Sequence, residues 1–197
     1  MKRSIKKNLK LSQIYQYSEE RQSFLVPISL ETYDELFNAW DAAPIKRRDI
    51  EPDLLHYLEQ VAFEIPLSEN IILVFQLPED IRDNRKEQIA KEAVYHNFTM
   101  IRHFINQETK RNNRKMVSYF IIGIIFLSAS YLFQNLLNPI FPFSILVDGF
   151  FIGGWVMFWE AFSLFFFSGN ELRSRRQRYI RYSDSIIEFN YQALQAS

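Results

Sequence analysis

The 197-residue sequence contains no cysteine and only five glycines. Without cysteine, a disulfide framework, a thiolate metal site and a cysteine nucleophile are excluded. All the glycines lie in or beside the two most apolar stretches of the chain, at positions 123, 149, 153, 154 and 169. Phosphate cradles of the P-loop and dinucleotide-binding types need glycines where the backbone approaches phosphate. These nucleotide-binding classes are therefore excluded, and we expect no cofactor, no metal and no catalytic residues.

The chain also lacks an excess of charge of either sign, since 23 Lys and Arg balance 23 Asp and Glu. A balanced charge gives no reason to expect nucleic acid as a partner. Residues 1–22 begin with five basic residues in the first ten, but no apolar segment of a signal peptide follows them. We therefore expect residues 1–22 to form a basic arm and not a cleaved signal peptide.

Two apolar runs, residues 116–137 and 143–168, dominate the sequence. Each exceeds the roughly 20 apolar residues that a helix needs to cross about 30 Å of hydrocarbon, and water-soluble cores seldom contain such runs. Only a few residues around Pro139 and Pro142 separate them. The sequence therefore predicts a transmembrane two-helix hairpin with the lipid bilayer as its first partner.

Basic residues flank the hairpin on one side only, because the linker 138–142 has none. Lys and Arg are retained on the cytoplasmic side of a membrane, so we expect a multi-pass membrane protein with both termini cytoplasmic. The same side chains could also bind lipid headgroups. These residues are Lys110, Arg111, Arg114, Lys115, Arg173, Arg175, Arg176, Arg178 and Arg181.

The segments outside the hairpin predict a small cytoplasmic α/β (α+β) domain at 23–115. Strand patterns occur at 24–28, where Pro27 favours an edge or a bulge, and at 71–77, which suits a central strand. Apolar spacing predicts helices at 31–42 and from Pro52 to Pro66. A third helix should start near Glu79 and Asp80, and no Pro or Gly interrupts 82–122, so we expect this helix to continue into the first span.

Residues 169–197 should return the chain to that domain. We expect the second span to continue as a cytoplasmic helix to Tyr182, with Gly169 and Asn170 as a possible kink. Beyond it, Ile187, Phe189 and Tyr191 alternate with polar residues, which is the period of a half-buried strand. The sequence therefore predicts that a C-terminal strand completes the sheet.

Glu160 lies within the second apolar run, where a carboxylate costs a few kcal/mol near the membrane centre unless it is paired or protonated. One interpretation is an ion or proton pathway. The other is a packing role, in which Tyr119 or Ser118 bonds the acid or Lys115 reaches it. Asp148 is expected at the outer interface, as a solvated residue at the start of a helix.

Small and polar residues share the helical face that carries Glu160. We expect this face to contact the first span or a second subunit and the aromatic face to contact lipid. The aromatic residues are Phe150, Phe151, Phe158, Phe162, Phe165 and Phe166. In an antiparallel hairpin, Ser130 would lie near Gly153 and Gly123 near Glu160. The residues of this expected site and its packing face are Glu160, Ser163, Tyr119, Gly123, Ser130, Gly149 and Gly153.

Three strings, Pro52-Asp-Leu-Leu-His-Tyr-Leu-Glu59, Val74-Phe-Gln-Leu-Pro78 and Gly153-Gly-Trp-Val-Met-Phe-Trp-Glu160, resemble an uncharacterised group of small bacterial two-span membrane proteins. The resemblance covers most of residues 24–191, favours a bacterial inner membrane and implies no activity. Three classes of function remain open. They are a non-enzymatic interaction or regulatory domain anchored by the hairpin, a homo-oligomeric channel or membrane-permeabilising effector, and an enzyme using cytoplasmic carboxylates and histidines.

Overall fold

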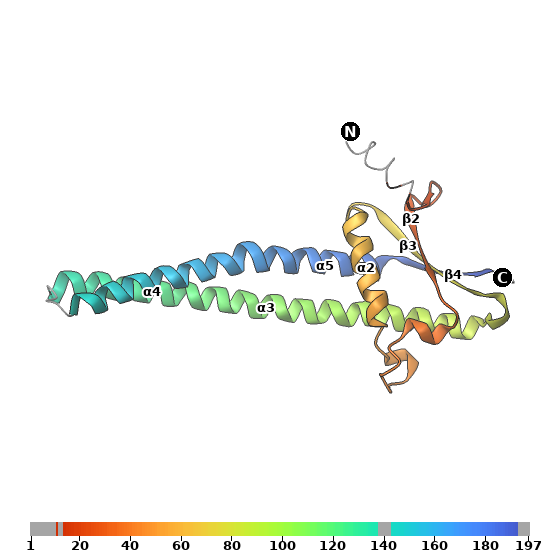
Figure 1. Ribbon diagram of the computed structural model, residues 1–197, viewed down its shortest axis with the longest axis horizontal. Coiled ribbons are helices and arrows are strands. Elements are labelled where there is room, and N and C mark those ends of the chain that lie inside the picture. The colour runs from red at the N-terminus through yellow and green to blue at the C-terminus, as the bar shows by residue number, and fades with distance from the viewer. Residues whose placement is uncertain (1–10, 12–13, 138–142, 193–197) are drawn as a thin grey trace. The chain divides into compact units, whose positions relative to one another are not determined.

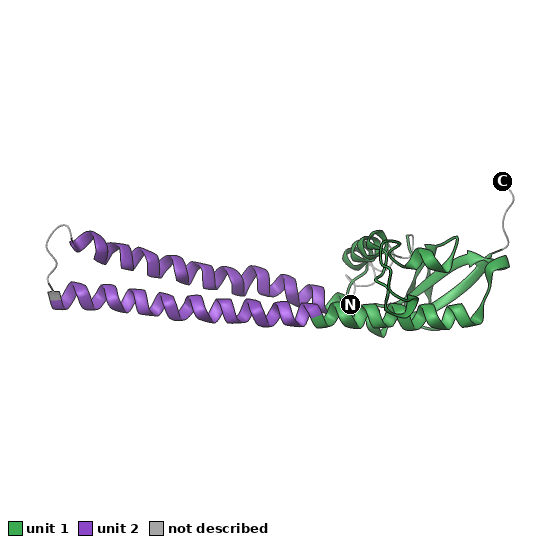
Figure 2. Cartoon of the chain, turned by 90° about the horizontal axis from the view of Figure 1, so that it is seen from below, with its two compact units in different colours: residues 1–103, 177–197 green, residues 104–176 purple. Residues whose placement is uncertain are grey.

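The computed structural model describes residues 11, 14–137 and 143–192. The chain forms two compact units, an α/β unit of residues 1–103 with 177–197 and a hairpin unit of residues 104–176 (Figure 2). The first ten residues of the expected arm and the linker between the spans lie outside the described residues. The basic residues on either side of the apolar runs fall mostly within the hairpin unit.

The α/β unit is built on a mixed sheet with the strand order β1-β2-β3-β4 (Figure 1). β1 (Tyr17–Ser18) is antiparallel to β2 (Ser23–Ser29), whereas β2, β3 (Asn70–Pro78) and β4 (Ile186–Gln192) are parallel. The central position expected of the strand at 71–77 is therefore observed, and the C-terminal strand pairs with it. Part of the segment predicted as an arm is integrated into this unit, because it supplies β1 and the buried Tyr15.

Pro27 lies where one edge of β2 is free. The Leu25 N–H donates to the Gln16 carbonyl at 2.8 Å. Backbone N–H groups alternate in direction along a strand, so the nitrogen of Pro27, two residues further on, faces the same side beyond the end of β1. No strand is paired on that side at this position, so the missing N–H of proline costs no hydrogen bond of the sheet. This agrees with the predicted edge position.

The predicted helix at 31–42 is wrong. Only one turn of 3-10 helix, η1 (Tyr33–Leu36), forms before Phe37 pairs with Ile50, and Trp40 is 95% exposed. The Asp41 carboxylate accepts the N–H groups of Ala43 and Asp49, both at 2.9 Å, and these bonds lower the pKa of Asp41. Such local side-chain bonds compete with helix formation, which explains why residues 37–50 form a loop containing only the short η2 (Ile45–Arg47).

Two helices of the α/β unit begin at residues that favour a helix N-terminus. α2 (Pro52–Glu64), which connects β2 to β3, has Pro52 in its first turn as predicted and buries Leu58 and Val61. α3 (Asn84–Leu137) begins later than predicted, because η3 (Glu79–Ile81) is a separate 3-10 turn. Asp83 caps α3 by accepting the N–H groups of Arg85 at 2.9 Å and Lys86 at 3.2 Å. α3 continues without a break through the first apolar run.

The second apolar run forms α4 (Phe143–Ser163), a π-helical turn η4 (Leu164–Ser168) and α5 (Gly169–Asp184). In the α/β unit, the start of α3 and the end of α5 pack together through Phe98, whose ring centroid lies 5.6 Å from that of Tyr182. The sheet lies against the same part of α3, since Lys91 Nζ lies 5.5 Å from the Phe189 ring centroid and Tyr191 donates to Glu87 at 2.5 Å. The core of this unit therefore needs residues from both sides of the hairpin.

The stability of the α/β unit should fall at alkaline pH. Burial raises the pKa of Tyr182 from 10.0 to about 12, and its hydroxyl donates to the Leu58 carbonyl. Because the folded state keeps a proton that the unfolded chain releases, this stabilisation is complete below pH 10 and is lost as the pH rises towards 12. Urea unfolding at stepped pH should show a loss of about 3 kcal/mol from this residue.

Tyr182→Phe should make that alkaline loss smaller but should not abolish it, because burial also raises the pKa of Tyr15 and Tyr191. Tyr17→Phe, on the more exposed β1, is the matched control. Equal pH dependence in the two variants would contradict the assignment.

Candidate functional site

The two helices of the hairpin unit approach most closely at two glycines. α3 and α4 run side by side in opposite directions (Figures 1 and 2). A Cβ atom added to Gly154 would lie 2.7 Å from Leu127 Cγ and 3.2 Å from the Gly123 carbonyl oxygen. Nearer the linker, the Ser130 hydroxyl donates to the Val147 carbonyl at 3.0 Å. These contacts pair Gly123 with Gly154 and Ser130 with Val147.

This pairing corrects the expected alignment of the spans. Ser130 lies opposite Val147 and not Gly153, and Gly123 lies opposite Gly154 and not Glu160. Small residues on both helices determine where the two backbones can approach closely. The spacing of residues along one helix does not show which residue of the other helix lies opposite. Following the pairing along both helices places Glu160 level with Val117, beside the basic end of the first span. Val117 is the second residue of the first apolar run, so Glu160 lies opposite the start of that run.

The face that carries Glu160 contacts the first span at Gly153 but is open at Gly149 and Glu160. Glu160 is exposed, and a Cβ atom on Gly149 would have no neighbour within 4 Å. Among the described residues, no hydrogen bond joins Glu160 to Tyr119, Ser118 or Lys115, and Ser163 is half-buried. Gly153 differs, since its Cβ atom would lie 3.0 Å from Phe126. The face was expected to contact either the first span or a second subunit. At Gly149 and Glu160 only contact with a second subunit is still a candidate.

Two aromatic residues expected to face lipid instead pack between the helices. The Phe158 ring lies 5.0 Å from that of Phe120, and the Phe150 ring lies 5.5 Å from that of Phe126. For these two rings the prediction was wrong, because they fill the space beside the small residues. The other four expected rings, Phe151, Phe162, Phe165 and Phe166, are exposed.

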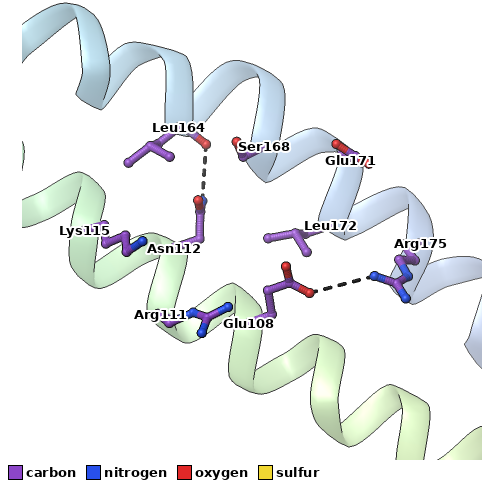
Figure 3. Close-up of a pocket in the computed structure, with 9 residues that line it drawn as sticks. All are labelled: Glu108, Arg111, Asn112, Lys115, Leu164, Ser168, Glu171, Leu172 and Arg175. Atoms are coloured by element: carbon purple, nitrogen blue, oxygen red, sulfur yellow. Dashed lines mark hydrogen bonds and ion pairs between the residues drawn. The ribbon is translucent and has the colours of Figure 1, made fainter.

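A polar cavity of about 250 Å³ opens between the helices at the basic end of the hairpin (Figure 3). Three basic residues from the expected headgroup set contribute to its wall. Lys110, Arg114 and Arg173 are exposed outside it. The residues that line the cavity are Glu108, Arg111, Asn112, Lys115, Leu164, Ser168, Glu171, Leu172 and Arg175.

The π-helical turn η4 forms part of this wall. The Gly169 N–H bonds the carbonyl of Leu164, five residues earlier, and Asn112 Nδ2 also donates to that carbonyl at 3.2 Å (Figure 3). π-turns frequently occur at functional sites. The kink expected at Gly169 and Asn170 is therefore a wider turn directly before them, while Gly169 itself stays helical. No sequence motif marks such a turn, and Asn112, the only amide among the cavity-lining residues, was not singled out by the sequence.

The charges of the cavity are only partly paired. Arg175 Nη1 lies 3.8 Å from Glu108 Oε2, and just outside the cavity Arg176 Nε donates to Asn106 at 2.8 Å. Within the described residues, Arg111, Lys115 and Glu171 make no ion pair or side-chain hydrogen bond. The cavity thus offers two unengaged cations and one unengaged carboxylate.

Arg178 and Arg181 lie in the α/β unit, where their side chains contact residues in or just after α2. Arg178 is 9% exposed and its guanidinium lies 4.8 Å from the centre of the Phe63 ring. Arg181 Nη1 donates to the carbonyls of Ile65 at 3.0 Å and Pro66 at 2.9 Å, just after the end of α2, and burial lowers its pKa. Both side chains are therefore packed within the α/β unit.

No protein-family model, curated protein or solved structure matches this chain. These comparisons therefore assign no activity, and they leave the resemblance to small two-span membrane proteins as it stands in the sequence. Two helices of the chain are long and apolar enough to cross a membrane.

Proposed function

We propose that the chain is a non-enzymatic integral membrane protein, in which the hairpin anchors an α/β domain that docks a partner protein on the cytoplasmic side of a bacterial inner membrane. One observation carries the proposal: a hairpin with an exposed apolar surface is joined to a separate unit with its own core. In the most apolar window of each long helix only 11% of residues are buried, whereas the core helix of a soluble protein would be mostly buried. Lipid is the environment that satisfies such a surface.

The more exposed face of the sheet, called the open face below, supports a docking role for the α/β unit. Val26, Leu73 and Ile187 are in register and buried on the side of α3. On the opposite side, Ile72 is buried, but Pro27 is exposed and Val74 is half-buried. Parallel strands are usually covered on both faces, so a partner protein covering this one would complete the arrangement.

Membrane fractionation tests the anchoring. The full chain should remain in the membrane pellet after an alkaline carbonate wash and dissolve only in detergent, because about 20 apolar residues per span resist extraction. Tags at residues 1 and 197 should both be inaccessible from outside intact cells. Release by carbonate alone, or an accessible tag, would contradict the proposal.

The same membranes test the docking. A photocrosslinking residue in place of Val74 should form a discrete adduct with one partner, whereas the same residue in place of the exposed Gln60 on α2 should not. Adducts at both positions, or at neither, would contradict docking through the open face. The exposed Glu160 face favours a second candidate, the homo-oligomeric channel. A defined homo-oligomer with a conductance changed by Glu160→Gln would support that alternative.

A further inference from the structure

We infer that the polar cavity of the hairpin unit binds the headgroup of an amine-bearing phospholipid, with Arg111 and Lys115 on its phosphodiester and Glu171 on its ammonium. This inference rests on the proposed membrane anchoring and names a specific lipid partner for the hairpin. All the residues involved lie within residues 104–176, and the chemistry follows from their position, their free charges and the size of the cavity.

The position of the cavity matches the boundary between headgroups and hydrocarbon. On α3, its last lining residue is Lys115, and the first apolar run begins at the next residue. On the opposite helix, the exposed rings of Phe165, Phe166 and Phe167 lie in the same π-helical turn that supplies Leu164 and Ser168 to the cavity. Cations therefore line both walls of the cavity, and exposed apolar rings lie beside it, as expected where lipid phosphates meet hydrocarbon.

The cations of the cavity suit a phosphodiester. Arg111 and Lys115 are exposed and unengaged within the described part of the chain, and together they offer a planar guanidinium fork and an ammonium. Hydrogen bonds between such cations and phosphate oxygens are about twice as strong as those between neutral groups. The Ser168 hydroxyl on the opposite wall adds a further donor.

The carboxylates of the cavity select the rest of the headgroup. Glu108 is already paired with Arg175, but Glu171 is not engaged by any described residue. A purely anionic headgroup or inorganic phosphate would place negative charge beside Glu171, whereas an ammonium neutralises it. A volume of about 250 Å³ exceeds the roughly 30 Å³ share of one water molecule several-fold, which allows a headgroup to enter while its acyl chains stay in the bilayer.

Lipid retention by the full chain tests this site. The protein is placed in nanodiscs of equal phosphatidylethanolamine and phosphatidylglycerol, and native mass spectrometry of the released protein counts the lipids that remain bound. We expect one phosphatidylethanolamine in excess over phosphatidylglycerol. The double variant Arg111→Gln/Lys115→Gln should lower this retention about tenfold, because two charge-assisted bonds are lost. Glu171→Gln should keep the lipid bound and shift the preference towards phosphatidylglycerol.

Arg173→Gln, which removes a cation outside the cavity, is the matched control and should leave retention unchanged. Retention in the double variant equal to that in the control, or no change of preference in Glu171→Gln, would overturn the inference. Thermal stabilisation by free phosphoethanolamine or inorganic phosphate equal to that by the lipid would reassign the site to a soluble phosphate and overturn it as well. If lipid retention shows no such selectivity while the protein still resists carbonate extraction, the headgroup site is wrong and the anchoring proposal stands. If carbonate releases the protein, the anchoring proposal itself fails.

Discussion

Replacing Gly154 with leucine should separate the helices of the hairpin and destabilise their packing by about 1–3 kcal/mol. Even a single Cβ atom there would lie 2.7 Å from Leu127 Cγ, which requires a shift of that side chain, and 3.2 Å from the Gly123 backbone, which moves only with the helix. A leucine adds three more carbons at the same point. Because leucine is also a far better helix former than glycine, a loss of stability must come from the contact between the helices.

Gly149→Leu is the matched control, since nothing lies within 4 Å of a Cβ atom at that position. It should leave the hairpin packing unchanged or raise helix stability by up to about 1 kcal/mol. The absence of cysteine allows a direct measurement in Ser130→Cys/Val147→Cys, whose disulfide should form readily in the parent chain. Its formation should be slowed by Gly154→Leu and not by Gly149→Leu. Equal rates in both would show that the helices do not meet at Gly154.

Phe98→Ala should lower the free energy of unfolding of the α/β unit by about 3–5 kcal/mol. Phe98 is 0% exposed, and its ring stacks on Tyr182 at 5.6 Å and lies 6.4 Å from the ring of Tyr179. The phenylalanine comes from α3, before the hairpin, and both tyrosines come from α5, after it. Truncation therefore leaves a cavity at the point where the returning chain closes the core.

Met100→Ala, two residues further along α3, is the control because Met100 is 42% exposed. Its effect should stay within about 0.5 kcal/mol, as for ordinary surface substitutions. Urea unfolding followed by near-ultraviolet circular dichroism in detergent would report the aromatic core of this unit. Similar losses in the two variants would mean that Phe98 is not at the centre of the core.

Local patterns predicted the elements whose cause is itself local. The alternation of Ile187, Phe189 and Tyr191 is enough to predict β4, and Pro52 with a helical apolar stripe is enough to predict α2. The helix expected at 31–42 shows where this reasoning fails. Its apolar spacing was correct for a helix, but Asp41 bonds backbone groups up to eight residues away and holds a loop instead.

The cavity was predictable only in part. Position beside the apolar runs was sufficient to select Arg111, Lys115 and Arg175, because membrane topology depends on charge along the chain. The carbonyl of Leu164 and the amide of Asn112 meet only because a π-turn and the opposite helix bring them together. Arg178 and Arg181 have the same charge and follow the second span closely, yet they contact Phe63 and the end of α2 in the α/β unit.

The sequence by itself determined two apolar helices, the basic residues at one end of them, and a small mixed domain closed by the C-terminal strand, because hydrophobic length and periodicity are properties of consecutive residues. Only the tertiary structure decided which glycines meet, that Glu160 lies near the basic end and is exposed, and which basic residues share a cavity. These features depend on the relative register of helices far apart in the chain. That register is set by how closely two backbones can pack, which residue spacing along one helix does not contain.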